Sequence, residues 1–202
     1  MKILFISLGC DKNLADSEEM LGLLTGSGHE IVDSEEDADA IVINTCCFIH
    51  DAKEESVNTI LEMAEYKKTG KCKALIVTGC MAQRYKEEIT QEIPEVDAVL
   101  GTTSYGDIVK ALNEAQAGHV FQEFRDINEL PEDSGRRVLT TGGHFGYLKI
   151  AEGCDKHCTY CIIPSLRGKF RSVPEERLLA QAEYMASQGV KELILVAQET
   201  TV

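Results

Sequence analysis

The sequence predicts an α/β protein: a doubly wound, mostly parallel open sheet, then a linker, then the first β-α-β portion of a further sheet. Over residues 1–118, short apolar runs alternate with longer segments of helical periodicity. That alternation is typical of a parallel sheet with helices on both faces. It breaks down over residues 119–146 and resumes over residues 147–202. We therefore expect a first domain at 1–118, a linker at 119–146 and the start of a second domain at 147–202.

The first domain is expected to contain strands wherever an apolar run is too short to be a helix. These strands are expected at residues 3–8, 30–32, 40–44, 74–78 and 96–100. The segments between them have helical spacing, and several end at a glycine. These helices are expected at residues 14–27, 51–68, 84–92 and 105–117. The acidic stretch "DSEEDADA" is expected to be a solvated turn.

The linker is charged, contains Pro131 and several glycines, and has no helical period, so we expect one or two extended segments in it. Beyond it, strands at 147–153 and 192–198 flank an amphipathic helix at 173–188. Two parallel strands with one helix leave edges and apolar faces open, and a complete (β/α)₈ barrel takes about 250 residues. We therefore expect a truncated unit, belonging to a longer protein or completed by another polypeptide.

The composition limits the cellular setting and the partners. The net charge of −14 argues against non-specific attraction of the whole chain to nucleic acid, although a local basic patch could still bind one. The apolar run at residues 3–8 is shorter than the ~7–15 residues of a signal h-region, and no run approaches the ~18 apolar residues of a membrane span. We expect a cytoplasmic protein with no membrane partner. There, eight cysteines favour metal or redox chemistry over disulfides.

Three cysteines lie close together directly after a predicted strand, as Cys154, Cys158 and Cys161 in a C-x₃-C-x₂-C pattern. A structural zinc site uses four ligands, and His157 would have to turn back past Cys158 to serve as one. Three thiolates suit a [4Fe–4S] cluster that leaves one iron open for a ligand or substrate. We favour the cluster over zinc.

A second set is spread along the chain, because Cys10, Cys46 and Cys80 each follow a predicted strand. In an open parallel sheet, the carboxyl ends of the strands face one crevice, where ligands bind. The three cysteines are therefore expected to converge in space. From the residues alone, buried structural cysteines remain an equal alternative.

At this point the sequence resembles a known family. "YLKIAEGCDKHCTYCIIPSLRGKFRS" is similar to the radical S-adenosylmethionine motif of the methylthiotransferases, and "SLGCDKNLADSE", "NTCCFI" and "VTGCMAQRY" resemble their amino-terminal domain. The resemblance covers essentially the whole chain. It implies two [4Fe–4S] clusters, a radical SAM TIM-like barrel that begins in the second domain, and S-adenosyl-L-methionine as a cofactor.

The resemblance also assigns the six motif cysteines. Cys154, Cys158 and Cys161 would hold the cluster that binds S-adenosylmethionine and cleaves it to a 5′-deoxyadenosyl radical. An auxiliary cluster, which carries the sulfur to be transferred, would use the spread set Cys10, Cys46 and Cys80. Tyr160 matches an aromatic position near the adenine, and Gln198 matches a position that approaches S-adenosylmethionine, although it could be only structural.

Two branches of the family differ in substrate. One, the RimO type, modifies an aspartate β-carbon in a small-subunit ribosomal protein, and the other modifies isopentenylated adenosine beside the tRNA anticodon. "SLGCDKN", "YLKIAEGC" and "RGKFRS" resemble the first branch. We therefore expect a ribosomal protein substrate and a reductant such as flavodoxin or ferredoxin, with tRNA as the alternative. This chain alone is not expected to turn over, since most of the barrel is absent from it.

Some residues leave alternatives open. Cys47 stands where the family usually has a small residue, so Cys46 is the expected ligand, and Cys72 matches no motif. Arg167 and Lys169 could steer a carboxylate or phosphate, or belong to a solvated loop. A non-catalytic iron–sulfur carrier and a zinc-binding α/β module are the alternatives to an enzyme.

Three polar residues after the first cysteine also match the family pattern. These are Asn13, Asp16 and Ser17. A helix-capping role would explain Asp16 or Ser17 without a role toward substrate.

Overall fold

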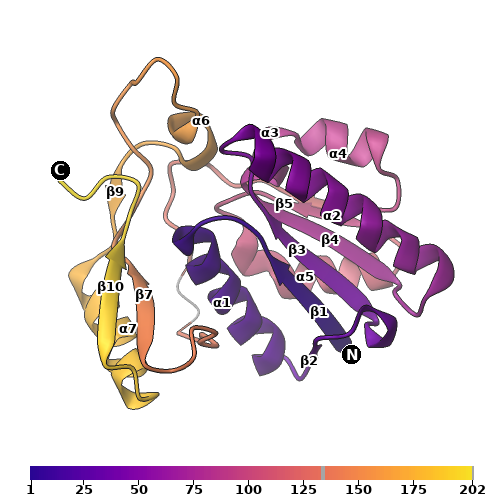
Figure 1. The fold of residues 1–202 in the computed structure, drawn as a ribbon, viewed down its shortest axis with the longest axis horizontal. Helices are drawn as coiled ribbons and strands as arrows, with labels where there is room; N and C mark the ends of the chain where they lie inside the picture. The colour runs from indigo at the N-terminus through magenta and orange to yellow at the C-terminus, as the bar shows by residue number, and fades with distance from the viewer. Residues whose placement is uncertain (133–134, 202) are drawn as a thin grey trace.

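The computed structural model describes residues 1–132 and 135–201. Its first part is a six-stranded sheet, ordered β2-β1-β3-β4-β5-β6, in which every neighbouring pair is parallel (Figure 1). The strands are β1 (Lys2–Ser7), β2 (Glu30–Val32), β3 (Ala40–Thr45), β4 (Ala74–Gly79), β5 (Ala98–Leu100) and β6 (Phe121–Glu123). The predicted open parallel sheet is confirmed.

Helices cover both faces of this sheet, as a doubly wound fold requires. One face is covered by α1 (Asp11–Gly26) and α5 (Ile108–Gln116). The opposite face is covered by α2 (His50–Thr69), α3 (Cys80–Arg84) and α4 (Lys86–Glu92). Since β3 and β4 lie in the middle of the sheet and are covered on both sides, all their residues are buried, which explains their near-continuous apolar sequences.

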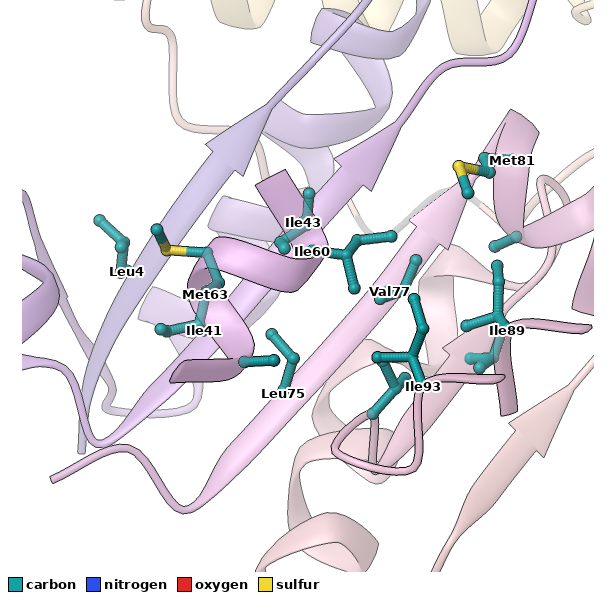
Figure 2. Close-up of a cluster of buried hydrophobic side chains, with 14 of the residues drawn as sticks. Leu4, Ile41, Ile43, Ile60, Met63, Leu75, Val77, Met81, Ile89 and Ile93 are labelled. Carbon is teal, nitrogen blue, oxygen red and sulfur yellow. The ribbon is translucent and has the colours of Figure 1, made fainter. Parts of the chain in front are cut away.

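The core on the second face shows how the helices are held (Figure 2). Ile60 of α2 and Ile89 of α4 pack with side chains from the central strands, among them Ile43 of β3 and Val77 of β4. Each of these side chains is at most 3% exposed. Burying an aliphatic side chain of this size contributes about 1.5–3 kcal/mol, so the apolar runs that predicted the strands also supply the core.

The structure differs from the predicted elements in several places. The helix predicted at 84–92 is two helices, and the first of them already begins at Cys80. A 3₁₀ turn, η1 (Glu35–Asp37), lies in the predicted acidic turn, and another, η2 (Tyr105–Asp107), precedes α5. The segment predicted as linker contributes β6, which pairs with β5. A three-residue edge strand has too short a pattern to be distinguished from extended loop.

The second part of the chain forms a smaller β-α-β unit. Its parallel strands are β7 (Phe145–Lys149) and β10 (Glu192–Val196), with α7 (Glu175–Ser187) between them in sequence. The connection from β7 to α7 also contains β8 (Ala151–Glu152), α6 (Ile163–Arg167) and β9 (Arg171–Ser172), where β8 and β9 pair antiparallel. This unit packs on the first part through α1, which lies beside β7 (Figure 1). Across the described residues, no helix has the length and apolar character needed to cross a membrane.

Candidate metal centres

The spread cysteines lie at the switch point of the sheet. β1 and β3 are neighbours, but the helices that follow them cover opposite faces, which opens a crevice beyond their carboxyl ends. Cys10 immediately precedes α1, Cys46 immediately follows β3, and Cys80 begins α3 directly after β4. All three line one cavity of about 560 Å³. The structure therefore brings together the three cysteines that are 36 and 34 positions apart in the sequence.

The turn that carries Cys10 packs tightly against Cys46. Gly9 has φ +101°, and a Cβ placed on it would lie 2.8 Å from the Cβ and 3.2 Å from the Sγ of Cys46. A side chain at this position would therefore be strained by its backbone conformation and would also displace Cys46. Glycine keeps the first two cysteine-bearing turns in contact.

Buried polar side chains hydrogen-bond to the backbone of the same turns. The Asn13 amide nitrogen donates to the backbone carbonyls of Leu8, at 3.1 Å, and Thr45, at 2.9 Å. The Ser56 hydroxyl accepts from the Cys46 amide at 3.1 Å and donates to the Cys46 carbonyl at 2.8 Å. Since Asn13 and Ser56 are fully buried, these bonds hold the positions of the two strand ends without competition from water.

The hypothesis that Asp16 or Ser17 caps the first helix is wrong. α1 begins at Asp11 rather than at residue 14, its N-cap is Cys10, and no side chain caps it. Asp16 and Ser17 therefore lie inside the helix, and both are buried. The Ser17 hydroxyl donates to the Asn13 carbonyl at 2.9 Å, whereas Asp16 faces the second part of the chain.

A fourth thiol, that of Cys47, lies close to Cys80 of the cavity wall. The Cys47 thiol points away to the Cys80 carbonyl, 3.3 Å from it. Burial and the neighbouring Cys80 raise the pKa of Cys47 to about 12. Burial also raises the pKa of the Cys80 thiol, but the charge of Arg167 opposes that rise.

The close-spaced cysteines lie in the loop between β8 and α6. Cys161 lines the same cavity as the spread set, Cys154 lines a separate surface hollow with His157, and Cys158 is exposed. The start of the loop is anchored, because the Cys154 amide donates to the Gly168 carbonyl at 3.1 Å. The three sulfurs are therefore near in sequence but are not all directed into one space.

The two other candidate residues in this region differ in their surroundings. Gln198 lines the cavity, and its side-chain oxygen accepts a bond of 3.0 Å from the amide of Gly153, the residue before Cys154. Gln198 thus ties the end of β10 to the cysteine loop. Tyr160 is 90% exposed and has no such place in the cavity wall.

Within the described residues, no group of three His, Cys, Asp or Glu side chains is already arranged to hold a metal ion. The residues nevertheless suit iron–sulfur clusters. Each set supplies three thiol sulfurs, the ligand atoms such clusters use, and the spread set borders a cavity large enough to admit a cofactor. The close set lies in a loop with two of its sulfurs partly covered and one exposed, so binding there requires that loop to close around the group.

A buried network of four charges joins the two parts of the chain beside the cavity. Lys149 of β7 pairs with Asp16 of α1 and, at 2.7 Å, with Glu152 of β8. Arg167 at the end of α6 lies 2.8 Å from Asp16 and 3.3 Å from Glu152. All four side chains are at most 7% exposed. Burial alone would raise the pKa of Glu152, but Lys149 and Arg167 hold it below its usual value.

The sequence did not predict this network, and the burial of Arg167 corrects the expectation that it could belong to a solvated loop. Arg167 is 3% exposed, so it does not belong to a solvated loop, whereas Lys169 is exposed. The one available signal was a pair of charged residues, Lys149 and Glu152, three apart in an otherwise apolar strand segment. Buried charges need partners, but the sequence does not reveal that Asp16 supplies one from another domain.

Each part of the chain matches a protein-family model. Residues 2–101 match the model described as "Uncharacterized protein family UPF0004", and residues 148–202 match the radical SAM superfamily. The fold and its cysteine loop thus define a radical S-adenosylmethionine protein. That superfamily implies a [4Fe–4S] cluster and S-adenosylmethionine as cofactors.

Similar whole proteins are named "Ribosomal protein uS12 methylthiotransferase RimO". The chain is 65% identical over 202 residues to the one from Lachnoclostridium phytofermentans, and covers 46% of it. It is 50% identical over 201 residues to the one from Clostridioides difficile, and covers 45% of it. Both alignments cover 100% of this chain. The chain belongs to the radical S-adenosylmethionine methylthiotransferase family and spans just under half the length of these relatives.

Proposed function

We propose that the protein to which this chain belongs is a radical S-adenosylmethionine methylthiotransferase that inserts a methylthio group at the β-carbon of an aspartate in a small-subunit ribosomal protein. The observation that carries the proposal is the shared cavity, whose wall contains Cys10, Cys46 and Cys80 from the sheet and Cys161 from the second cysteine loop. Sites that must cooperate on one carbon atom have to open into one space. The names of the relatives support the substrate.

In this proposal the six motif cysteines hold two [4Fe–4S] clusters. Cys154, Cys158 and Cys161 hold the one to which S-adenosylmethionine binds, and the spread set holds the auxiliary one. When bound, these groups supply the reductive cleavage of S-adenosylmethionine and the sulfur that is transferred. The protein holds and orients the cofactors and shields them from competing reactions.

The remaining cavity residues would receive the substrate. Phe48 and Ile49 line the cavity and are 54% and 56% exposed, so they offer an apolar rim against which a protein segment can exclude water. Lys12 brings a positive charge to the same wall, which complements the carboxylate of an aspartate. Gln198 would keep the S-adenosylmethionine loop in register with β10, and Tyr160 would cover the adenine once the loop closes.

The setting follows from this chemistry. Reductive cleavage consumes electrons, so we propose a low-potential protein reductant such as flavodoxin or ferredoxin. A ribosomal protein substrate and reduced thiols support a cytoplasmic setting for the proposed reaction.

The substrate is tested by incubating the reconstituted full-length protein with S-adenosylmethionine, a reductant and either a ribosomal-protein peptide or isopentenylated tRNA. We expect mass spectrometry to find the methylthio group on an aspartate of the peptide. Modification of the tRNA alone would refute the proposed substrate, and the same protein with Cys161→Ala serves as the inactive control.

A further inference from the structure

Arg167 reaches from the second part of the chain into the wall of the auxiliary cysteine site. It is the last residue of α6 and lines the shared cavity. One of its terminal nitrogens is held by the carboxylates of Asp16, at 2.8 Å, and Glu152, at 3.3 Å. The other terminal nitrogen, Nη2, is therefore free of these anions and points elsewhere.

That second nitrogen donates to the side-chain oxygen of Asn13. The same oxygen lies 3.8 Å from the Cys80 sulfur, and the Asn13 nitrogen holds the carbonyls of Leu8 and Thr45. Leu8 lies two residues before Cys10, and Thr45 directly precedes Cys46. A single amide thus touches all three cysteine-bearing turns, and the guanidinium fixes which way that amide faces. A flipped amide would set its NH₂ group against the cation and its oxygen against two carbonyls.

The positive charge of Arg167, as well as its hydrogen bond, acts on the site formed by Cys10, Cys46 and Cys80. Arg167 and Cys80 line the same cavity, and the guanidinium and the Cys80 sulfur both contact the side-chain oxygen of Asn13. The guanidinium therefore holds its positive charge one oxygen atom away from that sulfur. The planar guanidinium can engage Asp16 with one nitrogen and Asn13 with another, a geometry that the single ammonium of lysine does not provide.

We propose that Arg167 is a positioning residue for the site formed by Cys10, Cys46 and Cys80, where it orients the Asn13 amide and holds a positive charge beside Cys80. This inference rests on the proposed function, which assigns a cluster to these three cysteines. It makes the auxiliary site dependent on the radical SAM part of the chain. Because a nearby cation stabilises the more negative, reduced form of a cluster, Arg167 raises its reduction potential.

The test uses the full-length protein in which Cys154, Cys158 and Cys161 are replaced by alanine, so that only the auxiliary cluster is assembled. Iron and sulfide are counted first, and the midpoint potential is then measured by a titration followed by electron paramagnetic resonance. We compare this parent with Arg167→Met, which removes the charge and the donors, and with Arg167→Lys, which keeps the charge.

Arg137→Met is the matched control. Arg137 is also a buried arginine paired with a carboxylate of α1, since its Nε lies 2.8 Å from Glu18. Its described side-chain partners, the Glu18 carboxylate and the Tyr147 carbonyl, are not in the cysteine-bearing turns. Its loss should cost similar stability with the potential unchanged.

We expect Arg167→Met to shift the potential to more negative values or to lose the cluster iron. We expect Arg167→Lys to stay closer to the parent, and Arg137→Met to match it. A fully loaded Arg167→Met protein with the parent's potential would overturn the inference and leave the proposed function intact. A parent that binds no iron would instead overturn the auxiliary cluster itself, and this inference with it.

Discussion

Asp16 of α1 and Lys149 of β7 form a buried ion pair between residues 133 positions apart in the chain. The second Asp16 oxygen pairs with Arg167 at 2.8 Å, so both oxygens of this carboxylate bind cations from the second part of the protein. Burial lowers the pKa of Lys149, but Asp16 and Glu152 more than reverse this and raise the pKa well above its usual value. Lys149 is therefore charged at neutral pH, and the pair ties the two parts together.

Replacing Asp16 with asparagine should strongly destabilise the protein. The change leaves Lys149 and Arg167 buried with only Glu152 as a shared anion, and breaking a buried pair from one side costs about 3–5 kcal/mol. Urea unfolding followed by circular dichroism measures the loss. The control is Asp37→Asn, which removes an exposed pair with Lys71 and should cost no more than about 1 kcal/mol. Equal losses in the two variants would show that the buried pair does not hold the parts together.

Glu18 should keep the segment before β7 docked on α1. Its carboxylate accepts bonds from Arg137, at 2.8 Å, and from the amide and hydroxyl of Thr140, at 2.7 and 2.9 Å. We expect Glu18→Ala to release this segment, so that trypsin cleaves after Arg137 several-fold faster than in the unaltered protein. The cleavage rate is followed by mass spectrometry at low protease concentration. An unchanged rate at that site, with the cleavage sites elsewhere also unchanged, would contradict the docking.

Glu19 should make the free energy of unfolding fall as the pH rises above its unfolded pKa of about 4.3. Burial raises its pKa, and the charge of Lys149 only partly offsets this. A carboxyl group that binds its proton more tightly when folded contributes stability below its unfolded pKa of about 4.3. That contribution is lost as the pH rises through the folded pKa.

Glu19→Gln removes this titration while keeping an oxygen to accept the Tyr105 hydroxyl, which lies 2.9 Å from Glu19. The stability of the variant relative to the unaltered protein should therefore increase as the pH rises through the folded pKa of Glu19. Urea midpoints at about pH 4 and pH 7 measure the change. Glu62→Gln, on the exposed side of α2, should show no such trend; if both variants show the same trend, Glu19 is not its source.

Substitutions at two glycines with positive φ distinguish the effect of backbone strain from the effect of contact with a cysteine. Gly9→Ala adds a Cβ that would meet Cys46, so we expect loss of the auxiliary iron, about four of the eight atoms per chain. Gly28 has φ +85° with no atom within 4 Å of the added Cβ. Gly28→Ala should therefore cost only about 1–2 kcal/mol of strain and keep all the iron. Iron analysis after anaerobic reconstitution decides the matter, and full iron in Gly9→Ala would refute the role of this contact.

The sheet could be predicted from the sequence because its signal is local. β3 and β4 are apolar over most of their length, and the position of Cys46 and Cys80 just past these strands was enough to predict that they converge. The starts of α1 and α3 were harder to predict, because neither helix has a capping side chain. α1 begins directly after Cys10, and α3 begins at Cys80, directly after β4.

The charged network could not be predicted, because its pairs join residues far apart in the chain. Asp16 lies in a helix that also has an exposed acidic residue, Asp11, and sequence spacing alone does not distinguish a buried carboxylate from a solvated one. Arg167 was visible only as one of several cations after the cysteine loop. Its burial depends on how α6 packs against α3, which is tertiary information.

The iron content of two cysteine variants tests most directly whether the strand ends hold a second cluster. We predict about eight irons per full-length chain, and about four in each protein that lacks one cysteine set. Replacing Cys154, Cys158 and Cys161 with alanine should thus leave a [4Fe–4S] absorption band that depends on Cys10, Cys46 and Cys80. A protein without the close-spaced cysteines that binds no iron, or that binds stoichiometric zinc without iron–sulfur absorption, would contradict the two-cluster assignment.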